Sequence, residues 1–423
     1  MSMFSWLYRS VVLILLCLFA WQIYTHGMGR RTAELLEQEA FEGYQPLNSA
    51  FQMKADTWVT LAERANESGE PAIAEKTALR ALAENPTSGR AASHLLSLYN
   101  SNSSIATSVN ITDIADIAGN LWPAHTYTHS RLADYWAKQG RMEKTIPEWN
   151  ILLIRNPKLR QQLFPSLYQI TAKPEYHDLL SPYIKHPPVW WEQFFSFLSR
   201  EAQTEFLYQV YRQRQQSPAP LTDEEKRTYI ARLLKDKLWN EARQAWLQGL
   251  SETQQKQVGL VYDAGFEGKS FNTGFDWQLS ETKEISIKPD ITYGIKGQQA
   301  LHIHFRKGQP VNFQHVAQKL MLAPGQYQLS MQYRLDSFRS NKGLRWRIHC
   351  VENEETLLTE TEAFTGQKNW STLSSPFNVP QDGCAVQLLR LEADSRYRHD
   401  QVFEGHIWFD NVSITQVTDE KNH

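Results

Sequence analysis

The stretch QYQLSMQYRLDS, residues 326–337, alternates strictly between polar and apolar residues. Side chains two positions apart point to the same side of a β-strand, so this alternation predicts a strand with one buried face and one solvated face. The apolar positions are Tyr327, Leu329, Met331, Tyr333 and Leu335. The polar positions are Gln326, Gln328, Ser330, Gln332, Arg334 and Asp336.

Two further stretches repeat this pattern, namely LHIHFR at 301–306 and GLRWRIHCVE at 343–352. Gly, Pro and Asn residues separate the runs, as turns between strands require. Regularly spaced alternating runs of this kind indicate an antiparallel sandwich or jelly roll. We therefore expect a β-sandwich over residues 258–418, followed by a short tail at 419–423.

The preceding part of the chain, residues 31–257, has apolar residues at intervals of three and four, which predicts helices. Segments 58–86 and 129–157 match the template of the tetratricopeptide repeat, a helical hairpin with a period of about 34 residues. In the first segment the matching residues are Trp58, Leu61, Ala62, Ala65, Ala74, Ala81 and Pro86. Since small alanines let paired helices approach closely, we expect a tetratricopeptide-like helical solenoid.

Two helical segments need separate interpretation. HPPVWWEQFFSFLSR, residues 186–200, places aromatic residues at helical spacing after a pair of prolines. This pattern fits core packing between hairpins, or alternatively an aromatic surface for a protein partner or a sugar chain. The charges of TDEEKRTYIARLLKDK, residues 222–237, predict a solvated helix face.

Residues 1–30 contain an apolar run from Val11 to Trp21 that aromatic residues extend on both sides. Its length approaches the ~20 residues that a transmembrane helix needs. A cleavable signal peptide has small residues before the cleavage site, but this run ends in FAWQIYTH. We therefore expect an uncleaved single-pass membrane anchor, with a cleaved signal peptide as the alternative.

The overall composition excludes some functions. The formal net charge of -2 argues against a nucleic-acid-binding protein, which normally has a basic excess. The sequence contains no nucleophile elbow, no phosphate-binding Gly loop and no zinc-protease HExxH motif. We therefore predict that the protein is not an enzyme.

The β-rich part resembles the jelly rolls of galactose-binding-like carbohydrate-binding modules. The resemblance rests on the opening AGFEG…GFDW, the central LAPGQYQLSMQYR and the closing IWFDNVSI. The order of anchor, degenerate hairpins with PPVWW…FF, and sandwich is also similar to bacterial envelope proteins of exopolysaccharide or O-antigen assembly. This resemblance implies a non-catalytic scaffold in the inner membrane, with most of the chain in the periplasm. Its hairpins would bind polysaccharide polymerase, ligase or export proteins, and its sandwich would bind glycan.

Two alternatives to this function are open. The sandwich of a pure protein–protein scaffold would no longer bind sugar. A glycan-modifying enzyme would need a pair of carboxylates about 5–10 Å apart across a cleft. If the isolated sandwich binds no glycan, the pure scaffold is favoured. Carboxylates that converge on a pocket would favour the enzyme.

The resemblance also implies a structural calcium ion held by Glu267 in the opening motif and Asp410 in the closing motif. Calcium prefers six to eight oxygen ligands, which carboxylates and backbone carbonyls supply. Asn411 stands where a second acid is often found. The alternative is that both acids only cap turns.

Cys350 and Cys384 each fall on a predicted strand. If the two strands are neighbours, the cysteines are within disulfide distance. A disulfide would suit an oxidising compartment such as the periplasm. Two buried free thiols are the alternative.

The candidate glycan-binding residues are polar side chains on the solvated faces of the predicted strands. Their basic excess would favour an acidic polysaccharide. Any half-exposed sheet also shows polar residues, so a plain solvated face is the alternative. His302 and His304 are two positions apart, which also suits metal ligands. The full set is Gln328, Gln332, Arg334, Arg345, Arg347, His302 and His304.

Overall fold

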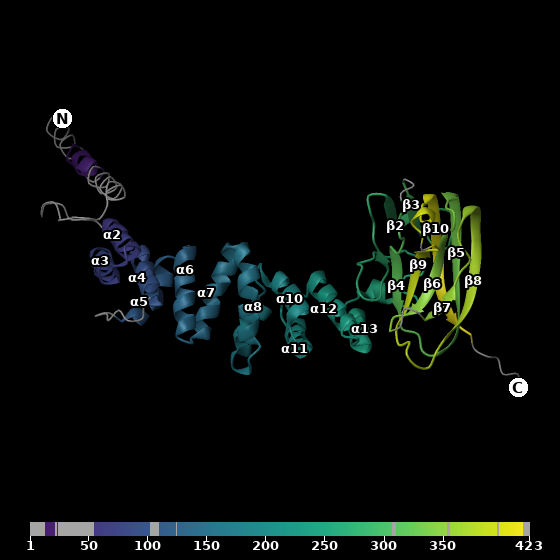
Figure 1. The fold of residues 1–423 in the computed structure, drawn as a ribbon, viewed down its shortest axis with the longest axis horizontal. Coiled ribbons are helices and arrows are strands. Elements are labelled where there is room, and N and C mark those ends of the chain that lie inside the picture. Colours follow the sequence, from purple (N-terminus) through teal and green to yellow (C-terminus); the bar gives the residue numbers. More distant parts are fainter. Residues whose placement is uncertain are drawn as a thin grey trace, which may run out of the picture. The chain divides into compact units, whose positions relative to one another are not determined.

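The computed structural model describes residues 13–21, 23, 55–101, 110–123, 125–306, 310–352, 356–395 and 397–417 (Figure 1). The chain divides into two compact units. The first comprises Met1–Phe194 with Gln216–Ala219, and the second comprises Phe195–Gln215 with Pro220–His423. The first is helical, and the second joins further helices to a β-sandwich.

The helices of the first unit form successive pairs. Their bounds are α2 (Ala55–Glu67), α3 (Pro71–Glu84), α4 (Gly89–Ser101), α5 (Ile111–Leu121), α6 (Thr126–Lys138), α7 (Met142–Arg155), α8 (Arg160–Thr171) and α9 (Ser181–Lys185). Helix α2 packs against α3, and α6 packs against α7. The predicted alanines Ala62, Ala65 and Ala74 are fully buried where the helices approach each other. The helical prediction is therefore confirmed, while the tetratricopeptide assignment stays a prediction.

The aromatic segment belongs to the core. Trp190, Trp191, Phe194, Phe195 and Leu198 are each no more than 1% exposed. The Trp190 indole donates a 2.9 Å hydrogen bond to the Asn150 side chain. Core packing is thus the correct interpretation of this segment, and the exposed-surface alternative is wrong. The helix itself, α10, spans Trp191–Glu201.

In the second unit, helices α11 (Thr204–Gln215), α12 (Asp223–Lys235), α13 (Trp239–Gln248) and α14 (Glu252–Gln255) precede the sandwich. Trp246 of α13 packs edge-on against Tyr262, with ring centroids 5.2 Å apart, and also contacts Phe275. The prediction of a solvated face over 222–237 is wrong at Glu225, which is fully buried in an ion pair with Arg214.

The sandwich consists of two antiparallel five-stranded sheets. Sheet A has the order β1 (Gln278–Leu279), β4 (Val316–Leu320), β9 (Gln387–Ala393), β6 (Leu344–Cys350) and β7 (Leu357–Glu360). Sheet B has the order β2 (Ile285–Ile291), β3 (Gln299–Phe305), β10 (Glu404–Gln416), β5 (Gly325–Arg339) and β8 (Gly366–Val379). The predicted antiparallel sandwich is confirmed.

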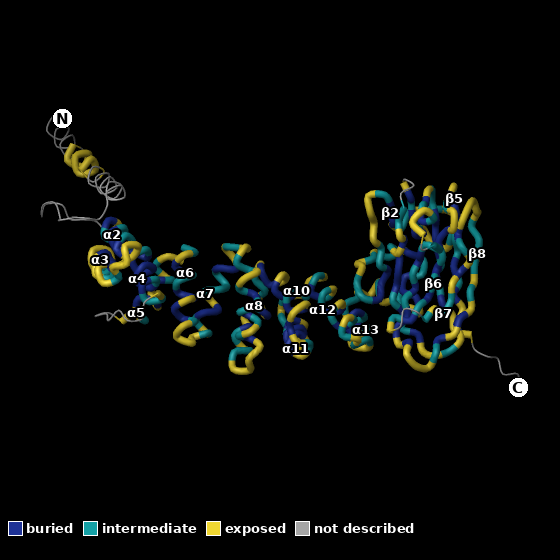
Figure 2. Tube along the Cα trace, in the orientation of Figure 1, coloured by how far each residue is buried: buried dark blue, intermediate teal, exposed yellow. Residues whose placement is uncertain are grey.

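The alternation that predicted β5 is realised in its packing. Tyr327, Leu329, Met331 and Leu335 are buried in the core between the sheets, and Tyr333 is partly buried against it. Apolar residues of β3, β6, β9 and β10 meet them there. Figure 2 shows buried positions interleaved with exposed ones along the strands.

Two buried carboxylates organise the loop at the start of the sandwich. Asp263 accepts 3.0 Å hydrogen bonds from the N–H groups of Glu267 and Gly268. Asp276 accepts from the N–H groups of Phe271 and Thr273 at 3.0 and 2.6 Å. Because these bonds satisfy backbone donors that no strand pairs with, they explain how this Gly-rich segment holds a fixed shape.

A disulfide joins Cys350 to Cys384. Cys350 ends β6, as expected, but Cys384 lies in the loop before β9 and not on a strand. Gln387 is the first residue of β9, and its side chain donates a 2.6 Å hydrogen bond to the Cys384 carbonyl.

The N-terminal prediction falls mostly outside the described residues. Residues 13–21 and 23 are helical, and their large apolar side chains are 59–68% exposed. None of the helices in the described ranges combines the length and the apolar character needed to cross a bilayer. The remainder of the predicted anchor, 1–30, and the tail from 418 lie outside those ranges.

Candidate functional site

The candidate glycan-binding residues do not share one surface. His302 and His304 on β3 and Gln328, Gln332 and Arg334 on β5 belong to sheet B. Arg345 and Arg347 on β6 belong to sheet A. Alternation assigns each residue to the solvated side of its strand, but it does not say in which sheet the strand lies.

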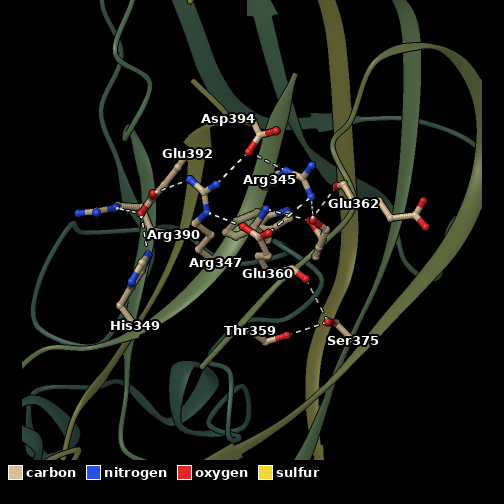
Figure 3. A network of polar contacts seen from close by, with 12 residues as sticks. Arg345, Arg347, His349, Thr359, Glu360, Glu362, Ser375, Arg390, Glu392 and Asp394 are labelled. Atoms are coloured by element: carbon tan, nitrogen blue, oxygen red, sulfur yellow. Dashed lines mark hydrogen bonds and ion pairs between the residues drawn. The ribbon is translucent and has the colours of Figure 1, made fainter. Parts of the chain in front are cut away.

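Ion pairs engage both arginines of sheet A (Figure 3). Arg347 contacts Glu360 of β7 at 3.0 Å, Glu392 of β9 at 3.3 Å and Asp394 at 2.9 Å. Arg345 contacts the same Asp394 at 2.7 Å. These guanidinium groups therefore hold the outer face of the sheet together and have little capacity left for a ligand.

The network extends to His349 and Arg390, which both approach Glu392, at 3.4 and 2.7 Å. Burial alone would raise the pKa of Glu392, but hydrogen bonds and charge from His349 and Arg390 outweigh it and lower that pKa to about 2. Glu392 is therefore a permanent anion under ordinary conditions.

A pocket of about 250 Å³ opens beside this network on the outer face of sheet A. Strand register explains its walls. Leu388 of β9 lies between Lys319 of β4 and His349 of β6, and Ala317 of β4 lies between Gln278 of β1 and Arg390 of β9. The full lining is Gln278, Gln314, Ala317, Lys319, His349, Cys350, Val351, Leu388 and Arg390.

Lys319 is the charge in this pocket that lacks a partner. No hydrogen bond or ion pair reaches its ammonium group from the residues that the structure places, and burial lowers its pKa. Arg390, in contrast, is already paired with Glu392. An unpaired, half-buried ammonium is stabilised by an incoming anion. Leu388 and Ala317 add an apolar floor, and Gln278 and Gln314 add amide groups.

Sequence reasoning missed Lys319, Gln278, Gln314 and Arg390. No sequence motif singles them out, and Lys319 is one of two polar residues in the five-residue strand β4, next to Gln318. Only the register of β1, β4, β9 and β6 brings them together.

On sheet B the predicted residues form a packed stack. His302 lies flat against Trp408 of β10, with centroids 3.8 Å apart and planes at 4°. Arg334 of β5, which is paired with Trp408 in the sheet, places its guanidinium over the same indole, 4.7 Å from the ring centroid. Trp408 is consequently only 8% exposed. The ring faces stack on one another, so they are not open to a sugar ring.

His304 and Gln332 on sheet B are also engaged, whereas Gln328 is exposed. His304 stacks on His406 with centroids 4.1 Å apart, and His302 shares a 2.9 Å hydrogen bond with His406. The Gln332 side chain accepts a hydrogen bond from the Asn411 side chain.

The metal-ligand alternative for the β3 histidines gains no support in the described ranges. Among these residues, no cluster of three or more His, Cys, Asp or Glu is placed to hold a metal ion.

Asp410 is the one fully buried carboxylate whose oxygens complete no hydrogen bond with the described groups. Burial raises its pKa to about 6, with a smaller contribution from the charge of Glu267, while N–H groups of Asn411 and Lys296 oppose the rise. A side-chain atom built on Gly265 would lie 3.7 Å from Oδ1 of Asp410 and 3.7 Å from the methylene carbon Cγ of Glu267, so both side chains approach Gly265.

Glu267 also caps a strand. Its Oε1 accepts from the N–H groups of Gln298 and Gln299 at 2.7 and 3.0 Å. The turn-capping interpretation therefore holds for Glu267, but it does not explain the orphaned carboxylate of Asp410. A buried anion whose oxygens complete no hydrogen bond is the setting in which a hard cation fits best.

Comparison with known proteins finds similarity at the level of structure. No protein-family model matches the chain, and no curated protein matches it. A carbohydrate-binding module of family 4 is similar over 38% of this chain and 99% of its own, with 15% identity and a TM-score of 0.27. The xylan-binding CBM22-1 domain from Paenibacillus barcinonensis Xyn10C covers 37% of this chain and 92% of its own, with 12% identity and a TM-score of 0.25. TmCBM61, solved with β-1,4-galactotriose, covers 38% and 99%, with 15% identity and a TM-score of 0.26.

Proposed function

We propose that this protein is a non-catalytic glycan-binding protein whose β-sandwich holds an acidic saccharide in the pocket of sheet A. The observation that carries the proposal is the unpaired ammonium of Lys319 above an apolar floor. A uronic acid matches both features, because its carboxylate is an anion and the C–H groups of its ring are apolar. Gln278 and Gln314 would hydrogen-bond to its hydroxyl groups.

The charge state of the pocket supports binding over catalysis. A glycoside hydrolase needs a carboxylic acid whose pKa is raised so that it can donate a proton. Glu392 beside the pocket has the opposite shift, and Glu360 and Asp394 are paired with arginines. A glycan-modifying enzyme is therefore the weaker candidate.

The expected result of replacing Lys319 by glutamine is a ten- to hundredfold weaker affinity for polygalacturonate. A hydrogen bond to a charged group contributes about 1.5–3 kcal/mol, and 1.4 kcal/mol corresponds to about tenfold. The measurement is binding of the full chain to immobilised polygalacturonate, with neutral dextran as the comparison. Lys342→Gln is the matched control, because Lys342 is exposed and outside the pocket lining.

The same titration tests the alternative function. If the wild-type chain binds neither polymer, or if Lys319→Gln and Lys342→Gln weaken binding equally, the pocket is not a glycan site. A pure protein–protein scaffold would then be the better description of the protein.

We further propose that the helical unit contacts proteins of polysaccharide assembly or export, and that the N-terminal segment anchors the chain in the inner membrane with its bulk in the periplasm. The exposed apolar side chains of residues 13–21 support the anchor. The disulfide between Cys350 and Cys384 supports an oxidising compartment. Co-purification from the native membrane, with identification of the bound proteins and glycans, tests this placement.

We also propose that Asp410 and Glu267 hold a structural calcium ion together with backbone oxygens. Without metal, the raised pKa of Asp410 means that its ionised form opposes folding above pH ~6, and that this penalty fades as the pH falls toward the ordinary value of 3.8. Calcium would remove the penalty by neutralising the carboxylate.

Replacing Asp410 by asparagine is therefore expected to stabilise the metal-free protein by about 1–3 kcal/mol at pH 7.5, since one pKa unit corresponds to about 1.4 kcal/mol. The difference should shrink as the pH falls to about 4. Added calcium should raise the Tm of the wild type but not of the variant. Calorimetry with calcium and with EGTA measures both effects, and a wild-type Tm that is the same in both would contradict the calcium site.

A further inference from the structure

A separate pocket of about 460 Å³ lies in the first unit and is lined by residues of α2, α4 and the start of α6. Helix α2 contributes Glu63 and Glu67, and α4 contributes His94. Trp122 lies just before α6, and Tyr127 lies in its first turn. Neither the sandwich nor its ligand pocket involves these residues.

His94 supplies an unused hydrogen-bond acceptor in this pocket. The side chain is buried, with the residue 6% exposed, and the ring donates a hydrogen bond to the Ala62 carbonyl. Its Nε2 has no partner among the described groups. A neutral imidazole donates from one nitrogen and accepts at the other, which assigns Nε2 as a buried acceptor. Burial lowers the pKa of His94 and so keeps the ring neutral.

Two acidic side chains, Glu63 and Glu67, line the pocket together with Arg90 and several uncharged or imidazole side chains (Asn66, Ser93, Ser97 and His125). Glu63 forms an ion pair with Arg90, which neutralises it. Glu67 is exposed and has no ion-pair partner within the helices that the structure describes. The pocket thus offers a free carboxylate and a buried lone pair, and both favour a ligand that donates hydrogen bonds and carries positive charge.

Two aromatic rings, those of Trp122 and Tyr127, also line this pocket. Trp122 is 37% exposed and packs on Gly89, where a side chain would clash with the indole at 2.5 Å. Tyr127 already has the guanidinium of Arg131 4.7 Å above its ring. Trp122 contacts the His125 ring edge-on, with ring centroids 4.6 Å apart, but no described cation lies over its indole. The indole can therefore meet a ligand cation, and Trp is the best ring for cation–π contact.

We propose that this pocket binds a lysine side chain of a protein partner. An ammonium group at the end of four methylenes reaches a deeply buried acceptor, while its stem lies along Trp122. The amine of an amino sugar is attached directly to a bulky ring and does not reach as far. This inference rests on the proposed role of the helical unit in binding proteins, and it is independent of glycan binding by the sandwich.

The test is calorimetric titration of the full chain with three probes: an acetylated and amidated Ala-Ala-Lys-Ala-Ala peptide, the same peptide with norleucine in place of lysine, and a glucosamine hexamer. We expect the lysine peptide to bind at least about tenfold more tightly than the norleucine peptide, because only the ammonium meets Glu67, Trp122 and His94. Glu67→Gln should weaken the lysine peptide several-fold. Glu84→Gln, an exposed acid of α3 outside the pocket, should leave it unchanged.

Equal affinity for the lysine and norleucine peptides would overturn the proposal, as would tighter binding of the glucosamine hexamer or the absence of any binding. An unchanged affinity in Glu67→Gln would also overturn it. Polygalacturonate binding measured on the same preparations separates the two sites. If the polymer binds and the lysine peptide does not, only the helical pocket is excluded.

Discussion

Replacing Arg214 by glutamine is expected to destabilise the junction of α11 and α12 by about 3–5 kcal/mol, the cost of leaving a buried charge without its partner. Arg214 and Glu225 are 1% and 0% exposed. Two parallel bonds join them, Nε to Oε1 at 2.8 Å and Nη2 to Oε2 at 3.1 Å. Without the guanidinium, the carboxylate of Glu225 would stay buried and uncompensated.

The effect should be local to the turn between α11 and α12. Glu225 also accepts from the backbone N–H of Thr222 in the capping box of α12, and Arg214 donates to the Pro220 carbonyl. Hydrogen exchange followed peptide by peptide therefore measures the loss where it occurs. Arg212→Gln, an exposed arginine of the same helix, is the control. Equal exchange in Arg214→Gln and Arg212→Gln would show that the buried pair does not stabilise this region.

Removing the Cys350–Cys384 disulfide is expected to cost about 3–4 kcal/mol. The two cysteines are 34 residues apart in sequence, and in the chain-entropy model a loop of that length restricts the unfolded state by about this amount. The measurement is urea unfolding of the double alanine variant against the oxidised wild type, read on the transition of the sandwich.

A reductant supplies the internal check on this prediction. It should shift the wild type toward the variant and leave the variant unchanged. Cys17→Ser should respond to reductant as the wild type does, because Cys17 is outside the disulfide. An oxidised wild type no more stable than the double alanine variant would refute the stabilising role.

The sequence predicts the sandwich because alternation is a local property. The burial of Leu329, Met331 and Leu335 follows directly from period-two spacing in β5. The partition of strands between sheets depends on long-range pairing, which no local pattern encodes. Arg345 and Arg334 therefore look equivalent in sequence although they lie on different sheets.

The candidate site shows the same limit. Arg345 and Arg347 are the most conspicuous basic residues of the strand pattern, and the fold uses them in ion pairs with Glu360, Glu392 and Asp394. Lys319 is inconspicuous in sequence and becomes distinctive only because its neighbours across β9 are apolar or already paired. The solvated-face prediction for 222–237 failed at Glu225 for a related reason, since its partner Arg214 lies on another helix.

The position of β10 has a consequence for biosynthesis. This strand comes last among the described elements, yet it lies between β3 and β5 and pairs with both. The ribosome must therefore synthesise the chain as far as Gln416 before β3 and β5 can be joined through β10. Until then the facing edges of β3 and β5 offer unpaired backbone groups to other chains. A nonsense mutation shortly before Glu404 would make this exposure permanent, and its product should depend on chaperones or proteases to avoid aggregation.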